Sequence, residues 1–219
     1  MEGVRTASNG ELFIPKPNKK LEAILDKKYL RQGKDLRWYN HPKDKDHLVD
    51  DTIFDGRGCY VVGKGPSLDK LDAGFFIPSW PIICINESIH TIEGLKITNP
   101  LYCIQQDKGL KGSCRPKTAK LWVAYEAKEY YLDYKKKSIF SVRDYGSHGM
   151  FTAMLAVEMA QRFGATRLEM LAFDSCCNGN VTYASSINRS LVGDGTRFIK
   201  ACVRIKQVAK IPISFIGIH

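Results

Sequence analysis

Short β-rich runs alternate with helical patterns along most of this chain, and that alternation limits the possible folds more than any other feature. Apolar runs of strand length cover residues 60–62, 82–85, 101–104, 121–124, 138–142, 168–172 and 213–216. Helical spacing of apolar residues runs from Met150 to Phe163, before Gly164, and from Thr196 to Lys210, before Pro212. Strands that are apolar on both faces are typical of a parallel sheet covered by helices. The sequence therefore predicts a Rossmann-like α/β fold, with a mostly parallel sheet and helices on both faces.

The first fifty or so residues have a different composition from the rest. They mix prolines, lysines and acids with few apolar residues, and they carry one short helical pattern near Leu21 to Leu30. The chain of 219 residues is long enough for one domain with a full core. We expect residues 1–55 to form a basic N-terminal arm with a short helix, and residues 56–219 to form the Rossmann-like domain.

Composition also bears on where the chain resides and on its thiols. No apolar stretch reaches the roughly 18–20 residues of a membrane span, and the N-terminus lacks the apolar core of a signal peptide. The seven cysteines are odd in number, and Cys59, Cys84, Cys103 and Cys202 lie inside apolar runs. We expect a cytoplasmic protein without a membrane span, whose cysteines are reduced and whose histidines and cysteines do not form a zinc site.

A formal net charge of +10 favours an anionic partner. Lysines and arginines outnumber acids between residues 108 and 143, and Arg197, Lys200 and Arg204 share one face of the second predicted helix. Phosphates, nucleotides, nucleic acid and anionic surfaces all fit this charge. A solvated basic surface without a partner is the alternative.

The segment "CYVVGKGPSLDKL", residues 59–71, joins a predicted strand to a tight turn. Gly63 and Gly65 follow the strand at the edge where open parallel sheets bind ligands, and glycine permits a close approach of phosphate or sugar to the backbone. Pro66 fixes the next backbone angle, and Ser67 adds a hydroxyl. Leu68 stands where the dinucleotide fingerprint needs a third glycine, and no GK[ST] of a phosphate loop follows. A purely structural turn is the alternative to a ligand-binding loop.

Four segments of the chain resemble one group of families. "VVGKGPSL" (61–68) resembles the G-x-G-P-S-L signature shared by bacterial sialyltransferases that use CMP-activated sialic acid and by the archaeal hydroxymethyl-dihydropterin pyrophosphokinase and motility-accessory-factor group. In the same order as in those families come "IICINES" (82–88), "LYCIQQD" (101–107) and the stretch 145–174 that begins "YGSHGMF". The likeness spans roughly residues 58–175 and leaves both ends of the chain outside it.

The resemblance implies a nucleotide site in the Rossmann-like domain. The residues that it assigns to this site are Gly63, Gly65, Pro66, Ser67, Asn86, Ser147 and Gly149. Lys64 replaces the asparagine usual in the sialyltransferase pattern, and its ammonium suits a phosphate. Ser147 and Gly149 open a predicted helix, where free N–H groups favour an anion. The alternatives are that Ser147 only caps a core helix and that Asn86 is a strand-end turn residue.

The candidate metal-binding and catalytic residues are two carboxylates, one histidine and one arginine. Asp107 and Asp174 each follow a predicted strand at the same sheet edge, where they would hold Mg²⁺ on a pyrophosphate or else cap neighbouring helices. The sialyltransferase pattern has a histidine base after its last matched segment, but residues 175–195 contain none. His148 and, second, Asp174 are therefore the candidate bases. Arg189, in a loop of lid length with Tyr183, is the candidate for neutralising a leaving phosphate.

Three functions fit these observations. The first is a glycosyltransferase that uses a nucleotide-activated sugar, of the CMP type by resemblance, and acts on a hydroxyl of a glycan or of a hydroxylated DNA base. The second is a Mg²⁺-dependent pyrophosphokinase-like transferase acting on a hydroxymethyl compound, with the metal on Asp107 and Asp174. The third is a non-catalytic module that binds nucleic acid through its basic surface.

Overall fold

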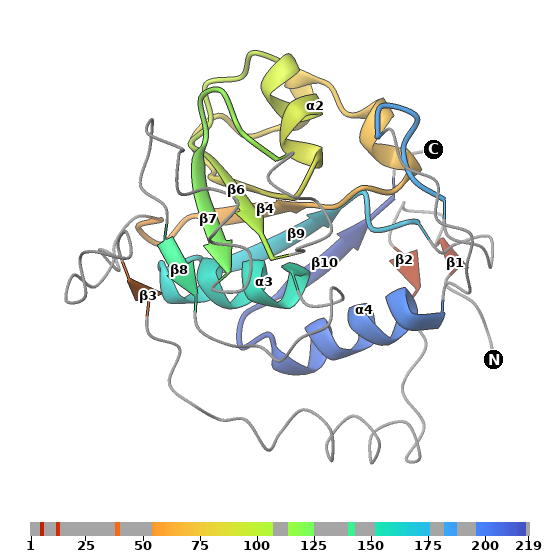
Figure 1. Cartoon of the computed structure of the whole chain (residues 1–219). Coiled ribbons are helices and arrows are strands. Elements are labelled where there is room, and N and C mark those ends of the chain that lie inside the picture. Colours follow the sequence, from red (N-terminus) through yellow and green to blue (C-terminus); the bar gives the residue numbers. More distant parts are fainter. Residues whose placement is uncertain are drawn as a thin grey trace.

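The chain folds around one large, mostly parallel sheet, as a computed structural model shows (Figure 1). The structure describes residues 54–106, 114–124, 140–142, 152–175, 182–187 and 196–217, together with the strand pairs at 5–6, 12–13 and 38–39. The eight strands of the sheet lie in the order β10-β9-β4-β5-β6-β7-β8-β3. Every neighbouring pair is parallel except β3 and β8.

The strands lie where the apolar runs predicted them. Their bounds are β4 Gly58–Val62, β5 Ile82–Ile85, β6 Leu101–Gln105, β7 Lys120–Ala124, β8 Phe140–Val142, β9 Arg167–Leu171 and β10 Ile213–Ile216. All five residues of β4 and all four of β5 are buried, as expected for central strands covered on both faces. The predicted α/β class with a parallel sheet is therefore confirmed.

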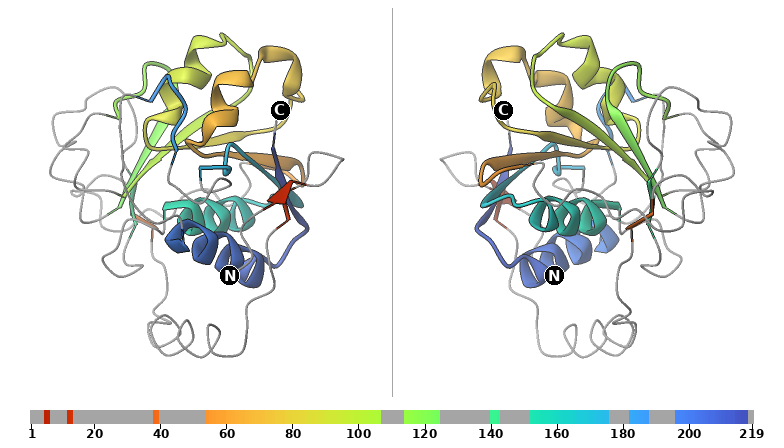
Figure 2. Two further views of the ribbon diagram at one scale, coloured as in Figure 1. Left: turned by 90° about the vertical axis from the view of Figure 1, so that its right-hand side faces the viewer. Right: turned by 90° about the vertical axis from the view of Figure 1, so that its left-hand side faces the viewer.

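Helices cover both faces of the sheet (Figure 2). On one face lie α3 (Thr152–Arg162) and α4 (Thr196–Val208), which pack against each other and against side chains such as Val61, Ile83 and Trp122. On the other face lie η2 (Pro66–Lys70), η3 (Ala73–Phe75) and α2 (Ser88–Gly94), over Tyr60, Val62 and Cys84. The two helices predicted within residues 150–210 are present, whereas α2 and the two 3-10 helices had no separate signal.

The sheet has one hydrophobic core on each face, because side chains alternate between the two faces along each strand. Val61 faces α3, while its neighbours Tyr60 and Val62 face η2 and α2, because successive side chains of a strand point to opposite faces. Gly164 then ends the α3 region with a φ of 88°, a left-handed angle that glycine adopts without strain. The chain can thus turn directly from α3 into β9.

The side on which successive strands are added to the sheet changes at β4. From β4 to β8 each strand is added on the same side, and the chain then returns through α3 to place β9 on the other side of β4 and β10 beyond it. Crevices for ligands in open α/β sheets lie at such a switch point, beyond the carboxyl ends of the strands. The loops after β4 and β9 meet at this point.

The N-terminal region contributes strands that the composition did not predict. β1 (Arg5–Thr6) and β2 (Leu12–Phe13) form an antiparallel pair, and β3 (Trp38–Tyr39) adds to the sheet edge beside β8. The short helix expected near Leu21 to Leu30 lies outside the described residues. The division of the chain at residue 55 therefore stays a prediction.

Two further expectations concern the membrane and the thiols. In the described part of the chain, no helix is long and apolar enough to cross a membrane. The described cysteines, which are Cys59, Cys84, Cys103, Cys114 and Cys202, are buried free thiols. Burial raises the pKa of the Cys59, Cys84 and Cys103 thiols, so these side chains stay protonated members of the core.

Candidate functional site

The candidate site is the edge of the sheet where β4, β5 and β9 end. Three turns meet there: residues 63–67 after β4, residues 86–87 after β5, and residues 172–175 after β9. Direct contacts join the first turn to each of the other two, through Gly65 and Ala172 and through Lys64 and Glu87.

The first turn needs glycine at positions 63 and 65 because there is no room for a side chain at either position. The Gly63 amide donates to the Leu171 carbonyl at 2.8 Å, and the Gly65 amide donates to the Ala172 carbonyl at 2.7 Å. A Cβ on Gly63 would collide with the Ala172 carbonyl oxygen, and one on Gly65 would collide with the Asp174 carboxylate. Both amides thus donate hydrogen bonds within the protein, and the absence of side chains lets the turn after β9 pack against this turn.

Ser67 and Asp174 come together at the switch point and bind each other. The Asp174 carboxylate accepts from the Ser67 hydroxyl at 2.5 Å and from the Ser67 amide at 3.1 and 3.3 Å. Ser67 is 1% exposed and follows Pro66, the first residue of η2. Asp174 therefore caps the start of η2 from the neighbouring turn, which is the capping role weighed for this carboxylate.

Lys64 is held between two other loops. Its ammonium lies 3.0 Å from a Glu87 carboxylate oxygen and 4.9 Å from the centre of the Tyr183 ring. The side chains of Lys64 and Glu87 are only 11% and 15% exposed. The charge of Lys64 is thus already balanced, and its ammonium occupies one defined place at this edge.

Asn86 has an unsatisfied side chain in a strained backbone. It is 5% exposed, its φ is 55°, and among the described residues its Oδ1 has no hydrogen-bond donor. An unsatisfied buried polar atom costs about 1–3 kcal/mol, so such an atom is retained where something else binds it. Ala172 has the same φ of 55°, so the strands on both sides of β4 end in left-handed residues that are not glycine.

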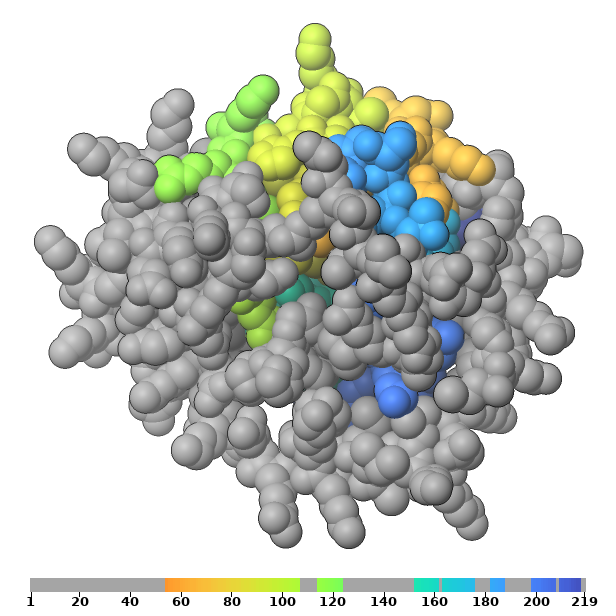
Figure 3. Space-filling model, turned by 45° about the vertical axis from the view of Figure 1, so that its right-hand side comes forward, coloured from red at the N-terminus to blue at the C-terminus, as the bar shows by residue number. Residues whose placement is uncertain are grey.

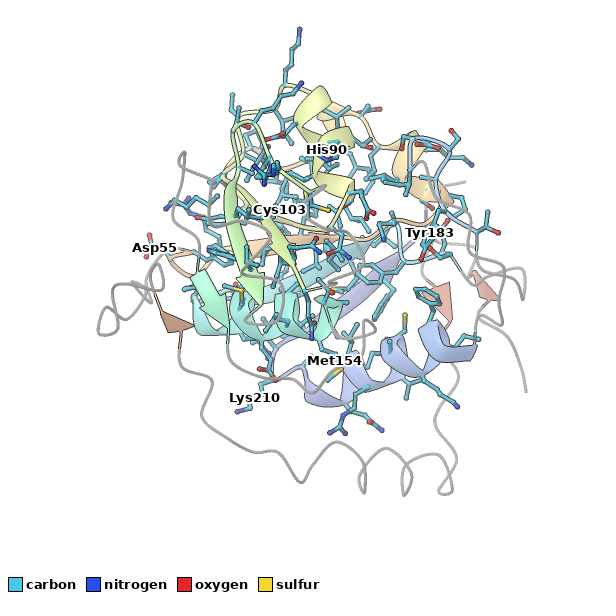
Figure 4. The ribbon with its side chains drawn as sticks, viewed as in Figure 1. Asp55, His90, Cys103, Met154, Tyr183 and Lys210 are labelled. Atoms are coloured by element: carbon cyan, nitrogen blue, oxygen red, sulfur yellow. The ribbon has the colours of Figure 1, made fainter. Side chains whose placement is uncertain are left out.

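The start of α3 lies toward the same edge. The carboxyl end of α3 leads through a short turn into the amino end of β9. Thr152, at the amino end of α3, therefore lies toward the carboxyl ends of the strands. Figure 4 shows Met154 near this end of the helix. Thr152 is 2% exposed, and within the described ranges its Oγ1 has no hydrogen-bond partner. Thr152 is thus a second buried polar group at this edge, and nothing in its sequence context had indicated it.

Several of the candidate residues cannot be placed. Asp107, Ser147, His148, Gly149 and Arg189 lie outside the described residues. Within the ranges that the structure describes, no cluster of three histidine, cysteine or acidic side chains is arranged to hold a metal ion. Magnesium on Asp107 and Asp174, and the roles of His148 and Arg189, stay predictions. For Asp174, binding a metal ion would compete with its bonds to Ser67.

Glu87 and Asp69 are neighbours of the candidate site that sequence reasoning did not single out. Glu87 pairs with Lys64 across 23 positions, and Asp69 binds Ser185 across 116. Both positions lie inside segments discussed above, 82–88 and 59–71, but their partners are distant in the sequence, so only the fold could bring them together. No protein-family model, no curated protein and no solved structure matches this chain.

Proposed function

We propose that the chain binds a nucleotide-activated sugar at the switch point and transfers its glycosyl group to an acceptor hydroxyl. The observation that carries the proposal is Asn86: a buried amide with an unpartnered oxygen, held in a strained backbone beside the switch point. Strain of this kind concentrates at ligand sites because the surrounding fold has to maintain it. An amide supplies both a donor and an acceptor, which suits the edge of a base or a ribose.

Lys64 is the cation of this edge that a phosphate would share with Glu87. Its ammonium has three donors, and the structure gives it one carboxylate oxygen of Glu87 at 3.0 Å. A phosphate beside Glu87 would therefore find a cation that is already positioned. Gly63, Gly65, Pro66 and Ser67 contribute differently: their contacts with β9 and Asp174 fix the shape of the turn that carries Lys64.

The reaction follows from this assignment. The bond between the anomeric carbon and the phosphate oxygen breaks, the electron pair leaves with the phosphate, and the acceptor oxygen bonds to the anomeric carbon. The acceptor proton passes to a base, for which we propose His148, with Asp174 as the alternative. Lys64 and Arg189 would stabilise the negative charge that develops on the leaving phosphate.

A nucleotide panel tests the proposal. Thermal unfolding is measured with CMP, CDP, UDP, GDP, AMP and ATP, each with and without Mg²⁺, because a ligand that binds only the folded state raises the unfolding temperature. We expect metal-independent stabilisation by a cytidine or another sugar-carrying nucleotide, followed by slow release of the nucleotide from its sugar derivative. Stabilisation by ATP alone, and only with Mg²⁺, would favour the pyrophosphokinase reading. If no nucleotide changes the unfolding temperature, both transferase functions are wrong, and the basic surface is the best remaining indication of function.

Asn86→Gly is the informative variant. Glycine accepts the φ of 55° without strain, so the substitution deletes the amide and leaves the backbone in place. Lys96→Gly is the matched control, because Lys96 is exposed, has a φ of 53° and follows α2 at the opposite edge of the sheet. We expect Asn86→Gly to lose the nucleotide effect and Lys96→Gly to keep it. Equal nucleotide effects in the two variants would remove Asn86 from the site.

A further inference from the structure

Residues 182–187, here called the strap, cross the side of the candidate site. Figure 3 shows the strap (light blue) on the surface between α2 (yellow) and the η2–η3 region (orange). Ala184 and Ile187 are buried against the apolar residues under these helices. The Thr182 amide donates to the Ser175 carbonyl at 2.7 Å, so the start of the strap is bound to the turn after β9.

Asp69, on η2, fastens the strap. One carboxylate oxygen accepts from the Ser185 amide at 2.5 Å and from the Ser185 hydroxyl at 2.8 Å, and the other accepts from the Ser186 amide at 3.2 Å. Burial opposes ionisation, but the hydrogen bonds from Ser186 and Ser185 outweigh it and hold the pKa of Asp69 below its ordinary value. The fastening group is therefore an ionised carboxylate with both oxygens engaged.

The other end of the strap holds Lys64. The Ala184 amide donates to the Lys64 carbonyl at 2.9 Å, and the preceding residue places its ring 4.9 Å from the Lys64 ammonium. That residue is Tyr183, which Figure 4 shows on the side of the molecule where η2 lies. Only Ala184 stands between Tyr183 and Ser185, whose amide Asp69 binds. A shift of the strap at Ser185 would thus change the position of the ring relative to the ammonium.

We propose that Asp69 is a positioning residue for Lys64. By fastening the strap at Ser185 and Ser186, Asp69 keeps the Tyr183 ring beside the ammonium that Glu87 also binds. The importance of this arrangement for ligand binding rests on the proposed function, in which Lys64 meets the phosphate. The arrangement itself does not depend on any ligand, so it is tested separately.

The first test uses the ring current of Tyr183. In protein carrying ¹³C-labelled lysine, the ε-methylene signal of Lys64 is assigned with Lys64→Arg, and in the wild type we expect it to be shifted upfield by the ring. Asp69→Ala should lose this shift, as Tyr183→Leu does, and Asp69→Asn should lose part of it. Asp72→Ala is the matched control, since Asp72 is a nearby η3 cap whose described bond goes to the Gly74 amide. An unchanged Lys64 signal in Asp69→Ala would overturn the proposal.

The second test asks whether Asp69 acts on ligand binding through Lys64. If the nucleotide panel identifies a ligand, Asp69→Ala should weaken its binding, by about tenfold for a coupled pair, and should have no further effect in a Lys64→Met background. Equal losses in both backgrounds would show that Asp69 acts by another route and would overturn that part of the proposal. A protein that binds no nucleotide would contradict the proposed function, while the lysine spectrum would still decide whether Asp69 positions Lys64.

Discussion

Gly65 has an extended backbone, with a φ of −69° and a ψ of 169°, which any residue can adopt. What excludes a side chain there is the turn after β9: an added Cβ would lie 2.8 Å from the backbone nitrogens of both Asp174 and Ser175. The glycine thus lets two turns pack against each other at the switch point. Asn86 is the opposite case, since it has a left-handed φ of 55° without being glycine.

The packing role of Gly65 predicts a stability effect that needs no ligand. Gly65→Ala should lower the free energy of unfolding by about 1–3 kcal/mol, because the new methyl group has to displace Asp174 or the backbone behind it. Gly94→Ala is the control: nothing lies within 4 Å of a Cβ there, and alanine in helix α2 should be neutral or stabilise by up to about 1 kcal/mol. Urea denaturation compares the two variants, and equal effects would contradict the packing argument.

At the scale of elements, α3 carries one acidic side chain in an unfavourable place. The helix buries Leu155, Val157 and Met159 against the sheet and α4, and Glu158 lies half-buried among them. Burial raises the pKa of Glu158 from 4.5 to about 7, although Lys210 acts in the opposite direction. Near neutral pH, folding therefore favours a proton on this carboxyl.

This shift predicts that Glu158 lowers stability at alkaline pH. Below about 4.5 the carboxyl is protonated in both the folded and the unfolded state, so its effect on the free energy of unfolding is absent; the penalty grows as pH rises and is complete above about 7. Glu158→Gln should therefore stabilise the protein at pH 8, by about 1–2 kcal/mol after allowance for solvent screening, and have little effect at pH 4.5. Thermal unfolding at both pH values is the measurement. A pH-independent effect would show that the glutamine acts through packing.

At the scale of the whole molecule, β4 is the central element. It pairs with β5 on one side and β9 on the other, and its side chains enter both cores. β10 is an edge strand of the same sheet, and its four residues are less buried than those of β4. The turns of the candidate site thus extend from interior strands of the sheet.

Hydrogen exchange should reproduce this order. Amides that are exposed only by global unfolding exchange most slowly, and those of edge elements are released by smaller openings. We expect the slowest exchange in β4 (Gly58–Val62) and β5 (Ile82–Ile85), slow exchange in β9, and faster exchange in β10 (Ile213–Ile216). Mass spectrometry of peptides from each strand measures these rates. Slower exchange in β10 than in β4 would contradict a sheet organised around β4.

The sequence alone determined the fold class because its information is local and periodic. The apolar runs predicted β5 and β10 with their observed bounds, and helical spacing ending at Gly164 predicted α3. Because the GKGPS turn follows a predicted strand, Gly63 and Gly65 were expected at the carboxyl ends of the strands, and the structure confirms this. Local pattern did not predict α2, whose seven residues are too few for a clear helical period.

Only the tertiary structure decided what the residues at that edge contact. The strand order puts β9 beside β4, so Asp174 reaches Ser67 over 107 positions, and the strap brings Tyr183 to Lys64. The sequence allowed Asp174 to bind metal or to cap a helix, and the fold directs its carboxylate to the start of η2. The difference is physical: periodicity reports which face of an element is buried, whereas a contact between distant residues depends on how the whole sheet is ordered.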